Sequence, residues 1–178
     1  MIRTSILTLL ALCLLVSAAP AAFAAGPCAG PGPGSRVAAG EPGWTNIVPG
    51  NDRGQTFIAT RPRITGIEVE LVTGNARHDA SDTLTLALTS PRGDVLAEVE
   101  RTVDSGEAGW LCFAMPQGGI DVRPGETLVL RLHDTGKVIF GWRYGKSTYR
   151  GGHTSMPNLD HSTSFAFHVH DASAQPGS

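Results

Sequence analysis

ITGIEVELVT, residues 64 to 73, is the stretch that decides the fold class of this chain. Apolar and acidic side chains alternate along it, in the order Ile67, Glu68, Val69, Glu70 and Leu71. A period of two residues is typical of a β-strand that is buried on one face and solvated on the other. The stretch therefore predicts a half-buried strand.

The start of the same stretch predicts an irregularity. Ile64 precedes Ile67 by three residues, which places the two side chains on opposite faces of a regular strand. Both can be buried on one face only if Thr65-Gly66 forms a β-bulge. The sequence therefore predicts a bulge at these two residues.

The alternation recurs along the rest of the chain, with turn residues such as Pro124-Gly125 between the segments. No segment shows a sustained helical period. The predicted strands are Gln55–Thr60, Ile64–Thr73, Thr83–Ser90, Val95–Val103, Trp110–Met115, Thr127–His133, Val138–Tyr144 and Ser164–His170. Eight short antiparallel strands in this length favour an all-β fold, a two-sheet β-sandwich of the jelly-roll type.

The two ends of the chain differ from this pattern. Residues 1–24 have a basic start, a short apolar stretch and an Ala-Phe-Ala cleavage site, which predicts a signal peptide cut near Ala24. Residues 25–54 are rich in Gly and Pro, and we expect an irregular lead-in. The sandwich is expected over residues 55–171 and a flexible tail over residues 172–178. No later segment is long and apolar enough to span a membrane, so the expected location is secreted or periplasmic.

The cysteines agree with export. Cys13 would leave with the signal peptide, and two cysteines in an exported protein most simply form one disulfide, Cys28 to Cys112. Closing so long a loop stabilises a fold by about 4 kcal/mol in the chain-entropy model. The predicted role of the bond is to tie the lead-in onto a strand.

Composition and motifs exclude some function classes. The chain has 14 basic and 16 acidic residues, a balance that gives no reason to expect a nucleic-acid partner. It has no G-x-S-x-G, HExxH or CxxC motif. Its carboxylates are numerous, and none is singled out as half of a glycosidase pair. The sequence therefore favours a protein without catalytic activity.

The stretch FGWRYGKSTYRGGH, residues 140 to 153, gathers aromatic and cationic residues. Exposed aromatic rings can stack on sugar rings, and nearby polar groups can bind the hydroxyls. The candidate ligand-binding residues are Tyr149, Trp142, Tyr144, Arg143 and His153, with Trp44 or Trp110 at the edge of the surface. Strand parity places Trp142 on the core side, so Tyr149 and its glycine-rich loop are the first expectation.

Histidines mark a second candidate site. His168 and His170 share the polar face of the last strand, and His133 lies on the outward face of another. If the last strand pairs with residues 64–73, Glu68 and Glu70 lie on the same surface. Two imidazoles and a carboxylate can bind Zn²⁺ or Cu²⁺, whereas outward histidines can also be plain polar positions.

A third candidate is a loop site for a structural Ca²⁺. Asn75, Asp79 and Asp82 offer the oxygen ligands that Ca²⁺ requires. Asp and Asn are also common in loops because they satisfy local backbone groups.

Several segments together resemble a group of secreted bacterial β-sandwich modules, similar to carbohydrate-binding modules with jelly-roll or galactose-binding-like folds. The resemblance covers about residues 55 to 170. It is carried by a PGE turn before Leu128–His133, an aromatic strand ending in Tyr149-x-Gly151-Gly152, and Asp160 shortly before a Phe-x-Phe strand. In such modules one sheet face or one set of loops presents aromatic rings to sugars, and a structural Ca²⁺ is common.

The resemblance implies a binding mode and no particular site. The expected function is a secreted, non-catalytic module that binds carbohydrate, such as a polysaccharide, or a cell-envelope polymer. The alternatives are an exported structural or protein-interaction domain and a periplasmic metal-binding protein that uses His133, His168 and His170.

Overall fold

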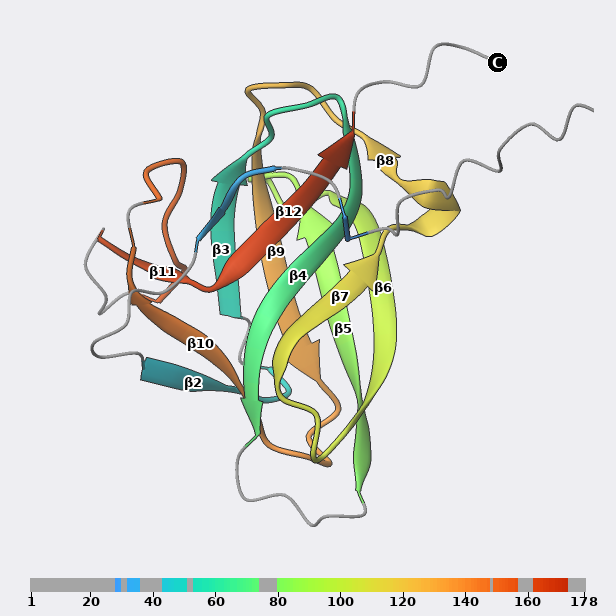
Figure 1. Cartoon of the computed structure of the whole chain (residues 1–178), viewed down its shortest axis with the longest axis vertical. Coiled ribbons are helices and arrows are strands. Elements are labelled where there is room, and N and C mark those ends of the chain that lie inside the picture. The colour runs from blue at the N-terminus through green and yellow to red at the C-terminus, as the bar shows by residue number, and fades with distance from the viewer. Residues whose placement is uncertain are drawn as a thin grey trace, which may run out of the picture.

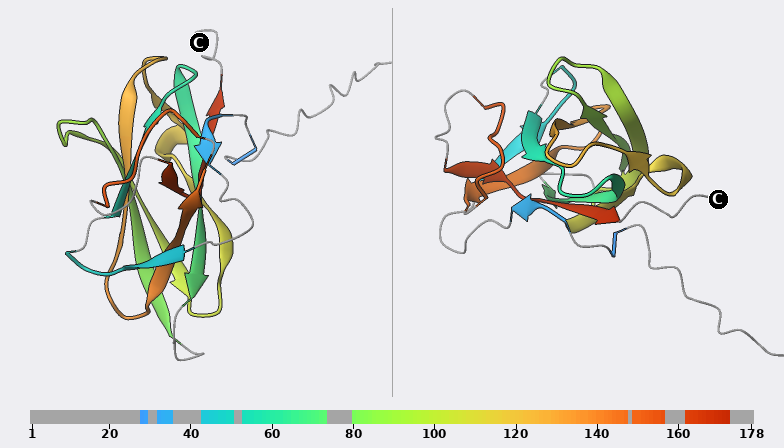
Figure 2. Two further views of the ribbon diagram at one scale, coloured as in Figure 1. Left: turned by 90° about the vertical axis from the view of Figure 1, so that its left-hand side faces the viewer. Right: turned by 90° about the horizontal axis from the view of Figure 1, so that it is seen from above.

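The computed structural model describes residues 28–29, 32–35, 43–50, 53–73, 80–147, 149–156 and 162–172. These residues form two antiparallel sheets that face one another, which confirms the predicted β-sandwich (Figure 1). Figure 2 shows the layers from the side and from above. None of the described residues forms a helix long and apolar enough to cross a bilayer. The predicted signal peptide, 1–24, lies outside the described residues.

The strands divide unequally between the two sheets. Sheet A contains β1 (Gly34–Ser35), β2 (Gly43–Ile47), β4 (Arg63–Thr73), β7 (Gly109–Ala114), β8 (Ile120–Asp121), β10 (Phe140–Lys146), β11 (Thr163–Phe165) and β12 (Phe167–Ala172). Sheet B contains β3 (Arg53–Ile58), β5 (Ser81–Thr89), β6 (Val95–Asp104) and β9 (Thr127–Asp134). One short 3₁₀ turn, η1 (Pro116–Gly118), joins β7 to β8.

The strand order is that of a jelly roll. Across sheet A the order β2-β10-β4-β7 faces the order β3-β9-β5-β6 across sheet B. β12 adds to sheet A by pairing with β4 beside β10, and β1 pairs with β12 at the outside. These pairings are all antiparallel, as the short turns of the sequence require.

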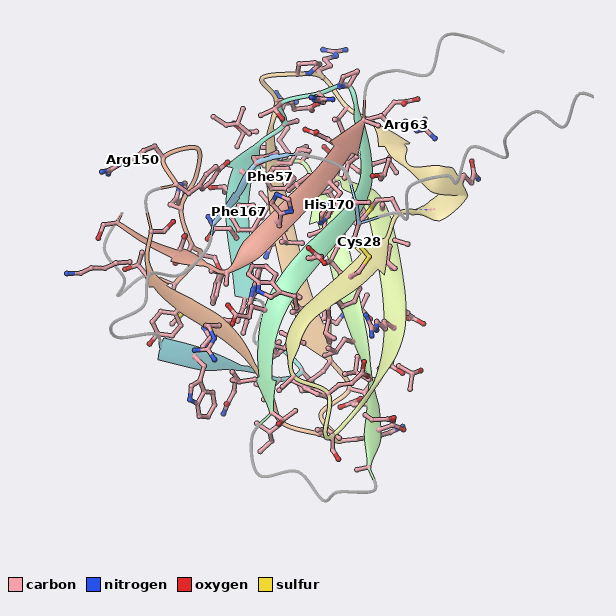
Figure 3. The ribbon with its side chains drawn as sticks, viewed as in Figure 1. Cys28, Phe57, Arg63, Arg150, Phe167 and His170 are labelled. Atoms are coloured by element: carbon pink, nitrogen blue, oxygen red, sulfur yellow. A yellow bond between two sulfur atoms is a disulfide. The ribbon has the colours of Figure 1, made fainter. Side chains whose placement is uncertain are left out.

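The core lies between the sheets and contains the apolar half of each alternating segment. The largest fully buried side chains are Trp142, Phe57, Phe113, Phe140, Phe165 and Phe167. Phe57 of sheet B meets Phe167 of sheet A with ring centroids 5.9 Å apart (Figure 3). Buried Gln55 is satisfied, because its Oε1 accepts a hydrogen bond from the backbone of Phe165 and its Nε2 donates to Thr56.

The bulge predicted in the opening stretch is confirmed. In the pairing of β4 with β12, Gly66 faces His170 and Ile64 faces Asp171, so Thr65 is the extra residue. Both Ile64 and Ile67 are thereby fully buried. The hydroxyl of Thr65 donates to the carbonyl of His170 at 3.1 Å, which fixes the backbone of β12 beside the bulge.

The predicted disulfide is also confirmed. Cys28 and Cys112 are bonded, with their Cα atoms 6.1 Å apart and 84 residues apart in sequence. Cys112 lies on β7 and faces Glu68 of β4. The bond therefore fastens the start of the described chain to the outer face of sheet A.

All eight predicted strands are present, but they are not the eight strands of the jelly roll. The first jelly-roll strand is β2, which is five residues long and lies within residues 25–54, the stretch that was expected to be irregular. The last predicted strand is split at Ala166 into β11 and β12. The chain changes neighbours there, since β11 pairs with β10 while β12 pairs with β4.

Candidate functional site

Four outward-facing residues form one row across sheet A, from β2 through β10 and β4 to β7. Trp44 faces Arg143 in the pairing of β2 with β10, and Glu70 faces Trp110 in the pairing of β4 with β7. An ion pair joins the two middle residues of the row, Arg143 and Glu70, whose Nε and Oε1 atoms are 3.0 Å apart. We call these four residues the tryptophan row.

The two tryptophans of the row are exposed aromatic side chains. Trp44 keeps 53% of its surface accessible and Trp110 keeps 37%. Ala166 lies between β10 and β4 at this level, accepting from the backbone of Glu70 and donating to that of Arg143. Three to four interstrand spacings, about 15 to 19 Å, therefore separate the backbones of the two tryptophans.

Gly141 provides the floor for the first tryptophan. A Cβ atom on Gly141 would come within 2.6 Å of the Trp44 ring and 2.9 Å of Val72 Cγ2. The indole therefore rests directly against the backbone of β10, and its other side is left to solvent. Close contact at a glycine holds the ring in place without enclosing it.

The centre of the row is polar. Nε of Arg143 is buried and finds no hydrogen-bond partner among the described residues, so its contact with Glu70 is an ionic one. The side chains of Arg143 and Glu70 remain 30% and 24% exposed. A guanidinium and a carboxylate together offer donors and acceptors to hydroxyl groups between two aromatic rings.

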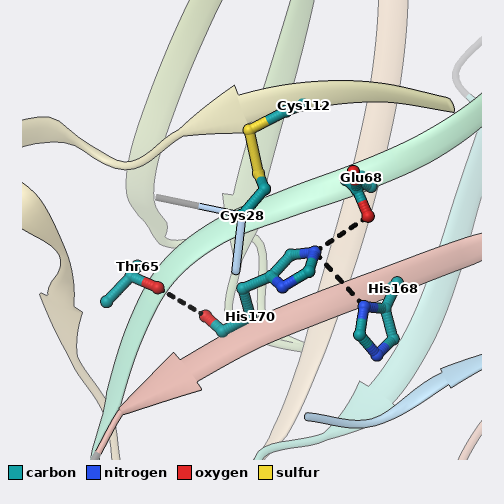
Figure 4. Close-up of polar contacts among 6 residues, drawn as sticks. All are labelled: Cys28, Thr65, Glu68, Cys112, His168 and His170. Atoms are coloured by element: carbon teal, nitrogen blue, oxygen red, sulfur yellow. Dashed lines mark hydrogen bonds and ion pairs between the residues drawn. A yellow bond between two sulfur atoms is a disulfide. The ribbon is translucent and has the colours of Figure 1, made fainter. Parts of the chain in front are cut away.

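A second group lies next to this row, also on the outer face of sheet A. His168 of β12 faces Glu68 of β4, which in turn faces Cys112 of β7. His170 Nε2 is 2.9 Å from Glu68 Oε2 and 3.2 Å from His168 Nδ1 (Figure 4). The histidine site was conditional on pairing of the last strand with residues 64–73, and β12 does pair with β4, which brings these histidines to a carboxylate.

Trp142 is not a ligand platform, and this prediction was wrong. The side chain is fully buried and stacks on Phe165 at a centroid distance of 4.1 Å. Its indole N–H donates to the carbonyl of Ala166 at 2.9 Å, as a buried tryptophan requires. Strand parity indicated this position, because Trp142 shares its face with Phe140.

The other predicted ligand-binding residues are dispersed. Tyr144 packs edge-on against Phe165, and its ring lies directly against the backbone of Gly43. Tyr149 packs edge-on against Phe167, and its hydroxyl accepts from the backbone of Ile58. Burial raises the pKa of Tyr149, against the effect of that hydrogen bond. Tyr149 thus fastens its loop to β3 and is not a loosely held ring.

The remaining two predicted residues are His153 and Arg143. His153 is exposed, and its backbone N–H donates to the hydroxyl of Thr56 at 2.7 Å. It lies on the loop beside β3, whereas Arg143 belongs to the tryptophan row. Of the five predicted residues, the structure therefore places Arg143 alone in that row.

His133 does not join the other two histidines, so the predicted three-histidine set was wrong. It lies on β9, facing Thr85 of sheet B, while His168 and His170 lie on sheet A. There it lines a hollow of about 350 Å³ whose walls are Ala87, Thr89, Gly93, Val95, Glu98 and Arg131. The alternation of side chains shows that His133 points outward, but it looks the same for strands of either sheet. It therefore could not show to which sheet His133 belongs.

Asp82, the described member of the predicted Ca²⁺ set, has a structural role. Its carboxylate accepts from the backbone of Thr83, Lys137 and Val138 and from the hydroxyl of Thr135. Burial alone would raise its pKa, but these hydrogen bonds outweigh that effect and lower it. Asp82 therefore holds the turn between β9 and β10. Asn75 and Asp79 lie outside the described residues.

The neighbouring Asp134 completes an unequal carboxylate pair. Burial, and then the charge of Asp82, raise the pKa of Asp134 from 3.8 to about 6. One low and one raised carboxylate also characterise glycosidase sites. Here both side chains are buried, with 2% and 4% exposure, so no substrate can contact them. The pair serves the fold.

Comparison with known proteins adds no functional assignment. No protein-family model matches the chain, and no curated protein matches it in sequence. What the molecule does has to be argued from the geometry of its surface.

Proposed function

We propose that this protein is an exported, non-catalytic β-sandwich module that binds carbohydrate, such as a surface polysaccharide, through the tryptophan row of sheet A. The observation that carries the proposal is the alignment of Trp44, Arg143, Glu70 and Trp110 in one outward-facing row. The row replaces the loop around Tyr149 as the proposed binding surface.

The chemistry of the row suits a sugar chain. An indole face makes apolar contact with the C–H side of a pyranose ring, and charged groups hydrogen-bond its hydroxyls. Here the aromatic rings stand at the two ends and the polar groups lie between them. A spacing of about 15 to 19 Å exceeds a single sugar ring, so the expected ligand is an oligosaccharide or a stretch of polymer that crosses the strands.

The disulfide supports the export part of the proposal. Disulfides persist in oxidising compartments and are rare in the cytosol. The bond between Cys28 and Cys112 anchors the chain on the face that carries the row. A periplasmic or extracellular location brings this face into contact with envelope or environmental polysaccharides.

The test is a binding screen followed by substitutions in the row. The protein is applied to a glycan array and sedimented with insoluble polysaccharides, and soluble hits are measured by calorimetry. Trp44→Ala and Trp110→Ala are each expected to weaken binding about tenfold or more, equivalent to about 1.4 kcal/mol, because each removes one aromatic contact. Leu96→Ala is the matched control, since Leu96 is an exposed apolar residue on sheet B with 42% exposure.

Tryptophan fluorescence provides a second readout. The chain has three tryptophans, and Trp142 is already fully buried. Ligand-induced protection from a soluble quencher should therefore come from Trp44 and Trp110. Absence of binding to every glycan and polysaccharide at millimolar concentration would refute the proposal. Binding that is insensitive to both substitutions would place the site elsewhere.

A further inference from the structure

The outer face of sheet A carries a cluster that the proposed carbohydrate surface does not use. His168, His170 and Glu68 point toward one another from β12 and β4 (Figure 4). The side chain of His170 is 6% exposed and that of Glu68 is 27% exposed. The cluster is therefore mostly buried, with an approach from solvent on the side of Glu68.

We propose that His168 Nδ1, His170 Nε2 and Glu68 Oε2 form a binding site for a divalent transition-metal ion, with Zn²⁺ as the best fit. Two imidazoles and one carboxylate are a ligand set that zinc uses in proteins when a fourth position is left to solvent. Imidazole nitrogen also favours this group of metals over Ca²⁺ and Mg²⁺.

Two of the three distances between the proposed ligand atoms suit a tetrahedral site. At Zn–N and Zn–O bond lengths of about 2.0 to 2.1 Å, neighbouring ligand atoms in a tetrahedron lie about 3.3 Å apart. His170 Nε2 lies 3.2 Å from His168 Nδ1 and 2.9 Å from Glu68 Oε2. His168 does not belong to the group of ligand atoms within 4.8 Å that contains Glu68 and His170. Binding an ion therefore requires the side chains of His168 and Glu68 to rotate toward each other, with His170 Nε2 between them.

The hydrogen bonding at His170 Nε2 points the same way. A neutral imidazole carries at most one hydrogen on that nitrogen. If this hydrogen is donated to Glu68, His168 Nδ1 has two options. It can accept a second, weaker share of the same hydrogen, or it can point its own hydrogen at His170 Nε2, which already carries one. A cation held by His168 Nδ1, His170 Nε2 and Glu68 Oε2 interacts favourably with all three atoms.

The backbone holds the ligands in place before any ion binds. His168 and His170 are two residues apart on β12 and so point to one side of the sheet, and Glu68 faces His168 across the pairing. The hydroxyl of Thr65, the extra residue of the bulge, donates to the carbonyl of His170. A bound ion would therefore link β12 to β4 through side chains that the backbone already places on one face.

The neighbouring sulfur is not part of the proposed ligand set. The Sγ atom of Cys28, Glu68 and His170 offer ligand atoms within 4.8 Å of one another. In the disulfide with Cys112, however, that sulfur is not a thiolate, and the thiolate is the form that binds metals. The proposed site thus has three protein ligands and one position for water.

The test uses the untagged, oxidised protein after treatment with a chelator, titrated with Zn²⁺ alone by calorimetry. One ion is expected to bind per chain with a submicromolar dissociation constant. His168→Gln and Glu68→Gln are each expected to weaken binding at least tenfold, and His170→Ala at least hundredfold. His133→Ala is the matched control, because His133 lies on sheet B, and it should leave the affinity unchanged.

A cobalt derivative identifies the ligands independently of folding losses. The Co²⁺-loaded protein should show the visible spectrum of a tetrahedral ion without thiolate-to-metal charge transfer. Thiolate charge transfer would overturn the proposed ligand set, as would a loss of affinity in His133→Ala equal to that in His168→Gln. Binding weaker than about a hundred micromolar would overturn the site. If His170→Ala does not fold, the two Gln variants decide.

Discussion

Replacing Asp134 by Asn is expected to stabilise the protein at neutral pH and to have little effect in acid. Asp134 is buried, and its Oδ1 accepts a hydrogen bond from the backbone of Gly136 at 3.1 Å. Among the described residues no donor reaches its Oδ2. The ionised form of this carboxyl is therefore poorly solvated by the protein, and it also lies beside the charge of Asp82.

The pKa of Asp134 gives the size and the sign of the effect. Burial, followed by the repulsion from Asp82, raises that pKa from 3.8 in the unfolded chain to about 6 in the fold. Between these two values the native state binds more protons than the unfolded state, so the free energy of unfolding falls as the pH rises. A shift of about two pKa units corresponds to about 3 kcal/mol, which is fully lost above about pH 6. Asn cannot ionise and does not incur this loss.

Urea unfolding of the wild type and of Asp134→Asn at several pH values measures the effect. The quantity of interest is the difference between the two free energies of unfolding, because the other titrating groups are common to both proteins. That difference should move by about 2 to 3 kcal/mol in favour of the variant between about pH 4 and about pH 7. Asp104→Asn, at an exposed position, is the control and should give a flat difference. A flat profile for Asp134→Asn, or a profile of opposite sign, would refute the reasoning.

Three other substitutions test the fold and the tryptophan row. Removing the disulfide with Cys28→Ser and Cys112→Ser should lower the free energy of unfolding in urea by about 4 kcal/mol, because an 84-residue separation is no longer closed. Trp142→Ala should lower it by about 3 to 5 kcal/mol, measured in the same way, since a fully buried ring is lost from its stack on Phe165. Gly141→Ala should cost only about 1 kcal/mol of stability but weaken carbohydrate binding in calorimetry as Trp44→Ala does, because the new Cβ displaces the indole.

Strand positions could be predicted from the sequence because a strand that is buried on one face alternates apolar and polar side chains. The bulge followed from the same logic, since Ile64 and Ile67 can both be buried only if the strand is interrupted. β2 was missed because Gly43–Ile47 is short and lies in a stretch rich in Gly and Pro. Its strand conformation depends on pairing with β10, which is almost a hundred residues away.

The candidate sites were harder to predict because they depend on which strands are neighbours. Parity showed that Glu68 and the two C-terminal histidines face outward, and pairing of β12 with β4 then brings them together. The same parity could not show that His133 belongs to the other sheet. The exposure of Trp44 depends on Gly141 beneath it, a contact between two segments that have no local relation in the sequence.

The two candidate sites meet on β4. Their arrangement makes it possible to tell the effect of a substitution in one site from the effect of a substitution in the other. Glu68 belongs to the histidine cluster and Glu70 to the tryptophan row, two residues or about 7 Å further along the same strand. Each carboxylate contacts a different strand, since Glu68 reaches His170 of β12 and Glu70 reaches Arg143 of β10. Substituting one carboxylate therefore leaves the partners of the other in place, and effects at such separations are close to additive. A variant of Glu68 or Glu70 that loses both metal and carbohydrate binding would indicate a change in β4 itself, not in either site.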